Sequence, residues 1–191
     1  MKTATKRRRG SAHVCPWWLA YTFDNPLRRL LHDPQKILGP YVAEGMTVVD
    51  LGCGMGHFTI GMARLVGETG RVIAVDLQQK MLDVVARRAR KAGVADRIRL
   101  HKCEPDRIGL DCTVDFALAC WVVHETPDLL KLFEEVLSTL KPAGKCLIAE
   151  PKIHIPRGQF DETVAVAEAM GFRVLDTPKV RLSHTALLGK A

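Results

Sequence analysis

Short apolar runs alternate with amphipathic segments along most of the chain after Gly45. The runs are rich in β-branched residues and have the length of buried strands, whereas the segments between them repeat apolar positions every three or four residues, as helices do. The pattern predicts strands at 47–51, 71–76, 97–101, 114–120 and 145–150, and helices at 57–66, 78–92, 128–140 and 161–170. This alternation requires crossover connections, which indicates a largely parallel sheet covered by helices on both faces.

The end of the chain departs from this alternation. Two strand-like runs, 172–176 and 181–188, follow one another with no room for a helix between them. Strands joined by a short connection pair antiparallel. We therefore predict an α/β fold with a mostly parallel, seven-stranded sheet and an antiparallel C-terminal hairpin at one sheet edge.

The 191 residues divide into three predicted parts. Residues 1–13 are polar and basic, and we expect them to be a disordered tail. Residues 14–44, whose apolar positions are interrupted by Pro16, Pro26 and Pro34, are expected to form a helical lid, and residues 45–191 the main domain. The longest apolar run, 116–123, is far too short to span a bilayer.

The net charge of +7 lies mostly in the tail. Lys2, Lys6, Arg7, Arg8 and Arg9 all fall within the first nine positions, and the other basic residues nearly balance the 21 acidic ones. The tail lacks the apolar region of a secretory signal, and the six cysteines form no C-x-x-C pair, so we expect a reduced, cytoplasmic protein. A nucleic-acid partner is compatible with the tail but is not favoured.

The most informative stretch is Val48-Val49-Asp50-Leu51-Gly52-Cys53-Gly54-Met55-Gly56. A buried strand that runs through three alternating glycines into a helix lets the backbone approach a ligand closely at the carboxyl edge of the sheet. The dinucleotide fingerprint G-x-G-x-x-G fails here, because its sixth position is His57 or Thr59. Asp76, at the end of the second strand, can accept hydrogen bonds from both hydroxyls of a ribose.

The glycine motif, Asp76 and the terminal hairpin together resemble the class I S-adenosylmethionine (SAM) methyltransferases, with their Rossmann-like sheet. The resemblance covers residues 45–190 and is closest to the branch of small-molecule enzymes typified by ubiquinone and menaquinone biosynthesis. Residues 78–82 look like the second-helix start of that branch, and residues 141–144 look like its loop before the fifth strand. The resemblance implies a methyltransferase that uses SAM and releases S-adenosylhomocysteine (SAH).

The same resemblance implies where the cofactor lies. The three glycines would flank the methionine part, Asp76 would hold the ribose, Leu77 would pack on the adenine and Glu104 would bind the adenine amino group. Glu104 is a departure from the family, which usually has Asp-Ala where this chain has Glu104-Pro105. The implied cofactor-binding set is Asp50, Gly52, Cys53, Gly54, Gly56, Asp76, Leu77, Cys103, Glu104 and Cys120.

Methyl transfer requires the protein to position the acceptor and, for some acceptors, to remove a proton. Titratable residues after the fourth and fifth strands, His124, Glu150 and His154, are the catalytic candidates, with Tyr21 from the lid. A structural role for His124 in orienting its loop, with Asp128 capping the next helix, is the alternative. The spacing of these side chains with His184 is not diagnostic of a metal, and we predict none.

We predict transfer of a methyl group to a small-molecule acceptor. Two alternatives stay open: an RNA methyltransferase that uses Lys6–Arg9 as an electrostatic tether, and a SAM-binding subunit without activity. The sequence determines neither the accepting atom nor the oligomeric state, because one fold serves many acceptors.

Overall fold

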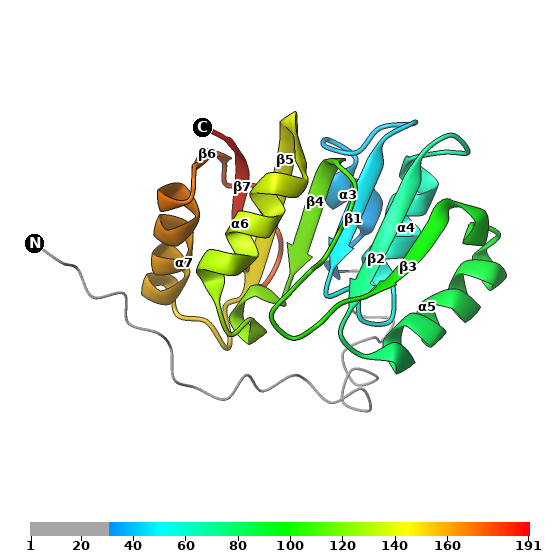
Figure 1. Ribbon diagram of the computed structural model, residues 1–191, viewed down its shortest axis with the longest axis horizontal. Coiled ribbons are helices and arrows are strands. Elements are labelled where there is room, and N and C mark those ends of the chain that lie inside the picture. Colours follow the sequence, from blue (N-terminus) through cyan, green and yellow to red (C-terminus); the bar gives the residue numbers. More distant parts are fainter. Residues whose placement is uncertain (1–30) are drawn as a thin grey trace, which may run out of the picture.

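The computed structural model describes residues 31–191, so the predicted tail, most of the predicted lid and Tyr21 lie outside the described residues. One seven-stranded sheet forms the centre of this part, with the strand order β3-β2-β1-β4-β5-β7-β6 (Figure 1). The strands are β1 (Thr47–Leu51), β2 (Arg71–Asp76), β3 (Ile98–Lys102), β4 (Val114–Cys120), β5 (Leu140–Pro151), β6 (Phe172–Asp176) and β7 (Ser183–Lys190). The predicted fold class is confirmed.

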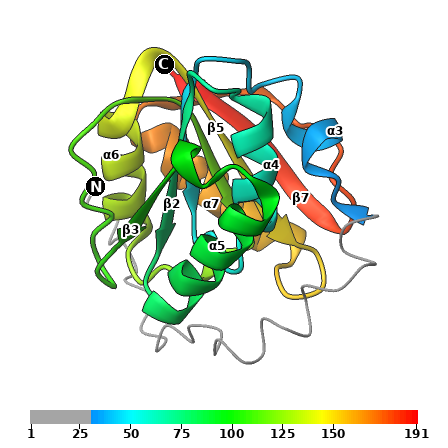
Figure 2. The same ribbon diagram turned by 90° about the vertical axis from the view of Figure 1, so that its right-hand side faces the viewer.

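Helices cover both faces of the sheet. They are α3 (Pro34–Leu38), α4 (His57–Leu65), α5 (Gln79–Ala92), α6 (Leu129–Thr139) and α7 (Arg157–Ala169). Figure 2 shows α3, α4 and α5 on one side of the sheet and α6 on the other. The core divides accordingly: Phe58 and Met62 of α4 pack with Val48 and Phe116 of the sheet, whereas Phe133 of α6 belongs to the cluster on the opposite face.

The pairing of the strands determines which residues share an edge. The β1–β2, β2–β3, β1–β4 and β4–β5 pairs are parallel, and β7 pairs antiparallel with both β5 and β6. The strand β6 therefore points the same way as β5. As a result, the β6–β7 connection lies at the same edge as the carboxyl ends of β1, β2, β4 and β5, where ligands bind in open α/β sheets.

The largest differences from the sequence prediction lie at two element starts. The strand β5 begins at Leu140 rather than Lys145, because Leu140 pairs with Val114 before a register shift ahead of Phe116. The helix α7 begins at Arg157 rather than Asp161, with Pro156 as its N-cap residue. Pro142 and Gly144 near the start of β5, and Pro156 before α7, are residues typical of loops, so the sequence predicted loops there. An extended backbone nevertheless accommodates proline near a strand start or at a helix N-terminus.

Between residues 31 and 191, none of the helices combines the length and apolar character that crossing a membrane requires.

Candidate functional site

The three glycines after β1 share a left-handed backbone but differ in what surrounds them. All adopt positive φ angles, of 63° at Gly52, 51° at Gly54 and 81° at Gly56. A Cβ at Gly52 would lie 2.3 Å from Cγ2 of Val122, and one at Gly56 would lie 3.0 Å from Cγ2 of Val85. A Cβ at Gly54 would meet nothing within 4 Å. Gly52 and Gly56 thus allow the loop to pack closely, and Gly54 is the position whose backbone faces open space.

The helix α4 begins directly after this loop. Gly56 is its N-cap residue, and no side chain caps it. The first N–H groups of a helix lack intrahelical partners and carry partial positive charge, so they suit a carboxylate. The start of α4 can therefore receive the carboxylate of a ligand that lies over Gly54.

Asp50 links the glycine loop to α4. Its side chain is buried, and Oδ2 accepts a hydrogen bond of 2.6 Å from the hydroxyl of Thr59 in α4. The contact joins the end of β1 to the first turns of the helix. This hydrogen bond indicates that Asp50 positions the glycine loop.

Asp76 ends β2 beside the loop. Its Oδ2 accepts from the Gly54 N–H at 2.9 Å, and its Oδ1 accepts from the Gln78 N–H at 2.8 Å. Burial raises the pKa of Asp76, and the hydrogen bonds from Gln78, Gly54 and Leu77 only partly offset that effect. Each carboxylate oxygen can accept more than one hydrogen bond, so Asp76 can fix Gly54 and still bind two hydroxyls.

The thiolate form of the two cysteines near Asp76 is disfavoured by their surroundings. Burial, together with the negative charges of Asp50 and Asp76, raises the pKa of Cys53 well above its usual value. Burial and then Asp76 raise the pKa of Cys103 to about 11. Both thiols are therefore protonated at neutral pH, and a protonated thiol is a poor nucleophile. They line the site as small apolar groups.

The adenine candidates are arranged less uniformly. Leu77 is half-buried directly after Asp76, as a packing residue requires. Glu104 is exposed, and its backbone forms an isolated bridge with Arg107. Cys120, at the carboxyl end of β4, is half-buried on the other side of the glycine loop. Leu77 and Cys120 therefore stay candidates for packing on the cofactor, and the Glu104 side chain is in contact with solvent.

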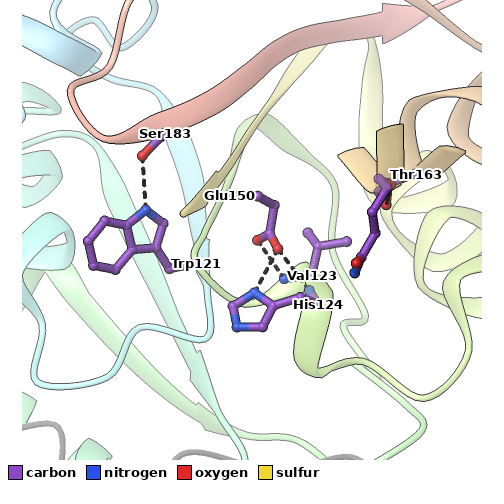
Figure 3. Close-up of polar contacts among 7 residues, drawn as sticks. Trp121, Val123, His124, Glu150, Thr163 and Ser183 are labelled. Atoms are coloured by element: carbon purple, nitrogen blue, oxygen red, sulfur yellow. Dashed lines mark hydrogen bonds and ion pairs between the residues drawn. The ribbon is translucent and has the colours of Figure 1, made fainter. Parts of the chain in front are cut away.

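His124 and Glu150 form a dyad at the carboxyl ends of β4 and β5 (Figure 3). The Nδ1 atom of His124 lies 2.6 Å from Oε2 of Glu150. The same carboxylate accepts from the backbone N–H groups of Val123 and His124, each at 3.1 Å. Glu150 is only 2% exposed, whereas the His124 side chain is 22% exposed. A buried carboxylate therefore orients a partly exposed imidazole, an arrangement typical of general bases.

The segment that leads from β4 to the dyad packs against the glycine loop. Val122, two residues before His124, is the residue that Gly52 approaches most closely. The intervening backbone is unusual, because Trp121 has a positive φ of 61°, which is rare for a bulky residue. Its indole Nε1–H donates to the Ser183 hydroxyl at 2.9 Å. Sequence reasoning missed Trp121 and Ser183, although an aromatic residue directly after a strand at the carboxyl edge was a usable signal.

The structure does not bring His154 to the dyad. It is exposed in the turn after β5, where its backbone N–H donates to the Pro151 carbonyl. His184 lies opposite Glu150 in the β5–β7 pairing, and its ring stacks on Phe160. Within residues 31–191, no three His, Cys, Asp or Glu side chains come together in a group that could hold a metal ion. Asp128 caps α6 by accepting from the Lys131 N–H, as predicted.

Comparisons with known proteins agree with this geometry. The family model described as "Methyltransferase domain" matches residues 43–175. The ubiquinone/menaquinone biosynthesis C-methyltransferase UbiE of Haemophilus ducreyi is 31% identical over 140 residues, which cover 73% of this chain and 52% of that protein. The demethylmenaquinone methyltransferase of Lactobacillus johnsonii is 33% identical over 57% of this chain and 45% of its own. The chain thus spans about half the length of these curated relatives.

A solved SAM-dependent methyltransferase from Aquifex aeolicus superposes with a TM-score of 0.80 at 29% identity, over 92% of this chain and 98% of that one. The chain belongs to the methyltransferase domain family, in the class I group that uses SAM as methyl donor.

The described residues fit SAM. The open face of Gly54, the uncapped start of α4 and the buried Asp76 carboxylate offer places for its backbone approach, its carboxylate and its ribose hydroxyls.

Proposed function

We propose that the protein transfers the methyl group of SAM to a carbon or oxygen of a hydroxylated small-molecule acceptor, with His124 as general base and Glu150 as its positioning residue. The observation that carries this proposal is the His124–Glu150 hydrogen bond of 2.6 Å at the sheet edge that also holds the glycine loop. The name of one relative, a ubiquinone/menaquinone biosynthesis C-methyltransferase, supports a carbon as the accepting atom.

The geometry defines a task for each member of the dyad. The Glu150 carboxylate holds the Nδ1 side of the ring, so Nε2, on the ring edge turned away from Glu150, is the atom that takes the proton (Figure 3). As the proton arrives, the imidazole becomes a cation, and the buried carboxylate stabilises that charge in a medium of low dielectric. General-base assistance of this kind contributes about 100- to 10,000-fold to a rate.

The cofactor side of the proposal uses the residues around Gly54. The start of α4 receives the SAM carboxylate, Asp76 accepts from the ribose hydroxyls, and Leu77 packs on the adenine. When bound, SAM supplies an electrophilic methyl group and leaves as SAH. The acceptor atom supplies the electron pair of the new bond, and the proton that the acceptor loses goes to Nε2 of His124. In this way atoms and charges balance without a further reactant.

The experiment has two stages. Radiolabelled SAM is first incubated with the full chain and cell extract, which is then separated into lipid-soluble, water-soluble small-molecule, RNA and protein fractions. The proposal predicts label in the lipid-soluble or the water-soluble small-molecule fraction. Label in RNA that depends on residues 1–10 supports the tether alternative, and SAM binding without label in any fraction supports a non-catalytic subunit.

The second stage examines the base. His124→Ala should lower kcat at least about 100-fold while the Kd for SAM changes less than about 3-fold. His154→Ala is the matched control, because it removes an exposed imidazole from the same edge. An equal loss of SAM affinity and turnover in His124→Ala would show that His124 is structural.

A further inference from the structure

A second concave site lies at the carboxyl edge, beyond the dyad. The turn after β5 and the β6–β7 connection enclose a cleft of about 430 Å³. The two segments are joined by a backbone hydrogen bond of 2.9 Å from the Lys152 N–H to the Leu182 carbonyl. The cleft is lined by Lys152, Arg157, Thr177, Pro178, Lys179, Val180, Arg181, Leu182, Ser183, His184 and Thr185. Its volume is within the range of small-molecule sites.

All formal charges in this lining are positive. Arg157 pairs with Asp161 at 2.9 Å, but both side chains are exposed, so this pair is weak. Lys152, Lys179 and Arg181 have no carboxylate partner within residues 31–191. Of the acidic residues nearest in sequence, Glu150 is buried and bonded to His124, and Asp176 is exposed and accepts from the Thr177 N–H. Three cations around one concavity repel one another unless an anion lies between them.

The cleft also borders the catalytic dyad. His184 lies directly opposite Glu150 in the β5–β7 register, and side chains so paired lie on the same face of a sheet. Ser183, next in the chain, accepts the indole hydrogen bond of Trp121. The β5–β7 strand pair therefore lies between the basic residues of the cleft and His124. An acceptor that extends from His124 toward β7 reaches the cleft with its far end.

From this placement we infer that the cleft binds an oxyanion of the methyl acceptor, a phosphate or carboxylate, with Lys179 and Arg181 as principal ligands and Lys152 beside them. The inference rests on the proposed function, because it assigns the far end of the same substrate. Arg181 can bind an oxyanion through two parallel hydrogen bonds. The exposed apolar surface of Leu182, 58% accessible, offers a wall for the carbon skeleton of the acceptor.

A small molecule fits these observations better than a nucleic acid or a lipid surface. The cations lie within one concavity between two turns, whereas a nucleic-acid footprint follows a basic stripe. Ile153 is 87% exposed beside the cleft, and an apolar tip next to lysines is also a feature of bilayer-docking surfaces. Nucleic acid and lipid vesicles are therefore each tested separately as ligands of the cleft.

The test is a titration of the ¹⁵N-labelled full chain with inorganic pyrophosphate, followed by amide NMR with and without SAH. Saturable shifts should occur in residues 152–157 and 177–185. The double variant Lys179→Met/Arg181→Met should weaken pyrophosphate binding at least about 10-fold, because it removes two charged hydrogen-bond donors from the anion. Lys179→Arg should retain binding.

Arg87→Met/Arg90→Met is the matched control, because it removes the same charge from exposed positions of α5, which lies next to β2 and β3, away from β6. Equal weakening in this control, or no saturable shifts in 177–185, overturns the inference. Binding only to phosphatidylglycerol vesicles or only to an RNA oligonucleotide, with no pyrophosphate shifts, also overturns it. SAH binding is read in the same spectra, so a chain that binds SAH but not pyrophosphate loses this inference alone, whereas a chain without SAH affinity contradicts the proposed function.

Discussion

Replacing Glu150 with glutamine separates the structural and chemical roles of the dyad. The carboxylate accepts three hydrogen bonds, from the Val123 N–H, the His124 N–H and the His124 ring. Glutamine has one acceptor oxygen. If that oxygen takes the place of Oε2, both His124 bonds survive and the amide NH₂ faces the Val123 N–H across 3.1 Å. The substitution therefore removes one buried hydrogen bond, sets two donors against each other and removes the negative charge.

The expected magnitudes follow from this geometry. An unsatisfied buried donor costs about 1–3 kcal/mol of folding free energy, which lowers Tm by about 2–12 °C in a chain of this size. The loss of the charge that stabilises the imidazolium should lower kcat about 10- to 100-fold, equivalent to about 1.4–2.7 kcal/mol of transition-state stabilisation. The effect is smaller than that of His124→Ala because the ring keeps its orientation.

The assay combines thermal unfolding with steady-state methyl transfer across pH. The acidic limb of the pH–rate profile should move to lower pH in Glu150→Gln, because the imidazole loses the anion that favours its protonated form. Glu134→Gln, an exposed carboxylate on α6, is the matched control and should leave both readouts unchanged. A variant with lower Tm but unchanged kcat and pH profile would refute the general-base role and leave Glu150 as a structural residue.

The other predictions concern the cofactor site and its edge. In urea unfolding, Gly52→Ala should destabilise the protein more than Gly54→Ala. Both substitutions cost about 1–2 kcal/mol because the backbone is left-handed, but only Gly52→Ala adds a clash with Val122. Equal losses of unfolding free energy in the two variants would contradict the close packing at Gly52. Gly54→Ala should instead weaken SAM binding, measured by calorimetry, through its new methyl group on the open face. As the pH is lowered, SAM affinity should begin to fall at a higher pH than it would with an aspartate of ordinary pKa. The reason is that burial raises the pKa of Asp76 and only the ionised carboxylate accepts from both ribose hydroxyls. Asp76→Asn should make SAM affinity less dependent on pH. His154→Ala should keep kcat within about 2-fold of wild type, as expected for an exposed side chain.

The strands that sequence reasoning predicted best are those with sharp chemical boundaries. The observed β1, β2, β4 and β6 have the predicted bounds, and a glycine lies directly next to β1, β2 and β6. The starts of β5 and α7 were wrong where proline and glycine lie inside or next to a regular element. Periodicity does not contain the tertiary pairing of Leu140 with Val114 that extends β5.

In the site, too, the features set by local sequence were predicted and those set by tertiary packing were not. The glycine loop and Asp76 follow from local sequence, because a strand, a tight turn and a helix occur within a few residues. The contact of His124 with Glu150 joins residues 26 positions apart, and it depends on the parallel register of β4 and β5, which no local pattern specifies. The orientation of Asp50 toward Thr59, and the exposure of Glu104, likewise depend on packing. Both residues stay predictions as cofactor ligands.

The central claim is that SAM binds over Gly54 with its ribose on Asp76, next to the dyad. Isothermal titration of SAM into the full chain and into Asp76→Ala tests this most directly, with Asp83→Ala, an exposed aspartate on α5, as control. The account predicts saturable one-to-one binding by wild type and by the control. Asp76→Ala should weaken that binding at least about 10-fold, because it removes hydrogen bonds to a charged group. A wild-type chain without SAM affinity, or an Asp76→Ala chain that binds as tightly as wild type, would contradict the account.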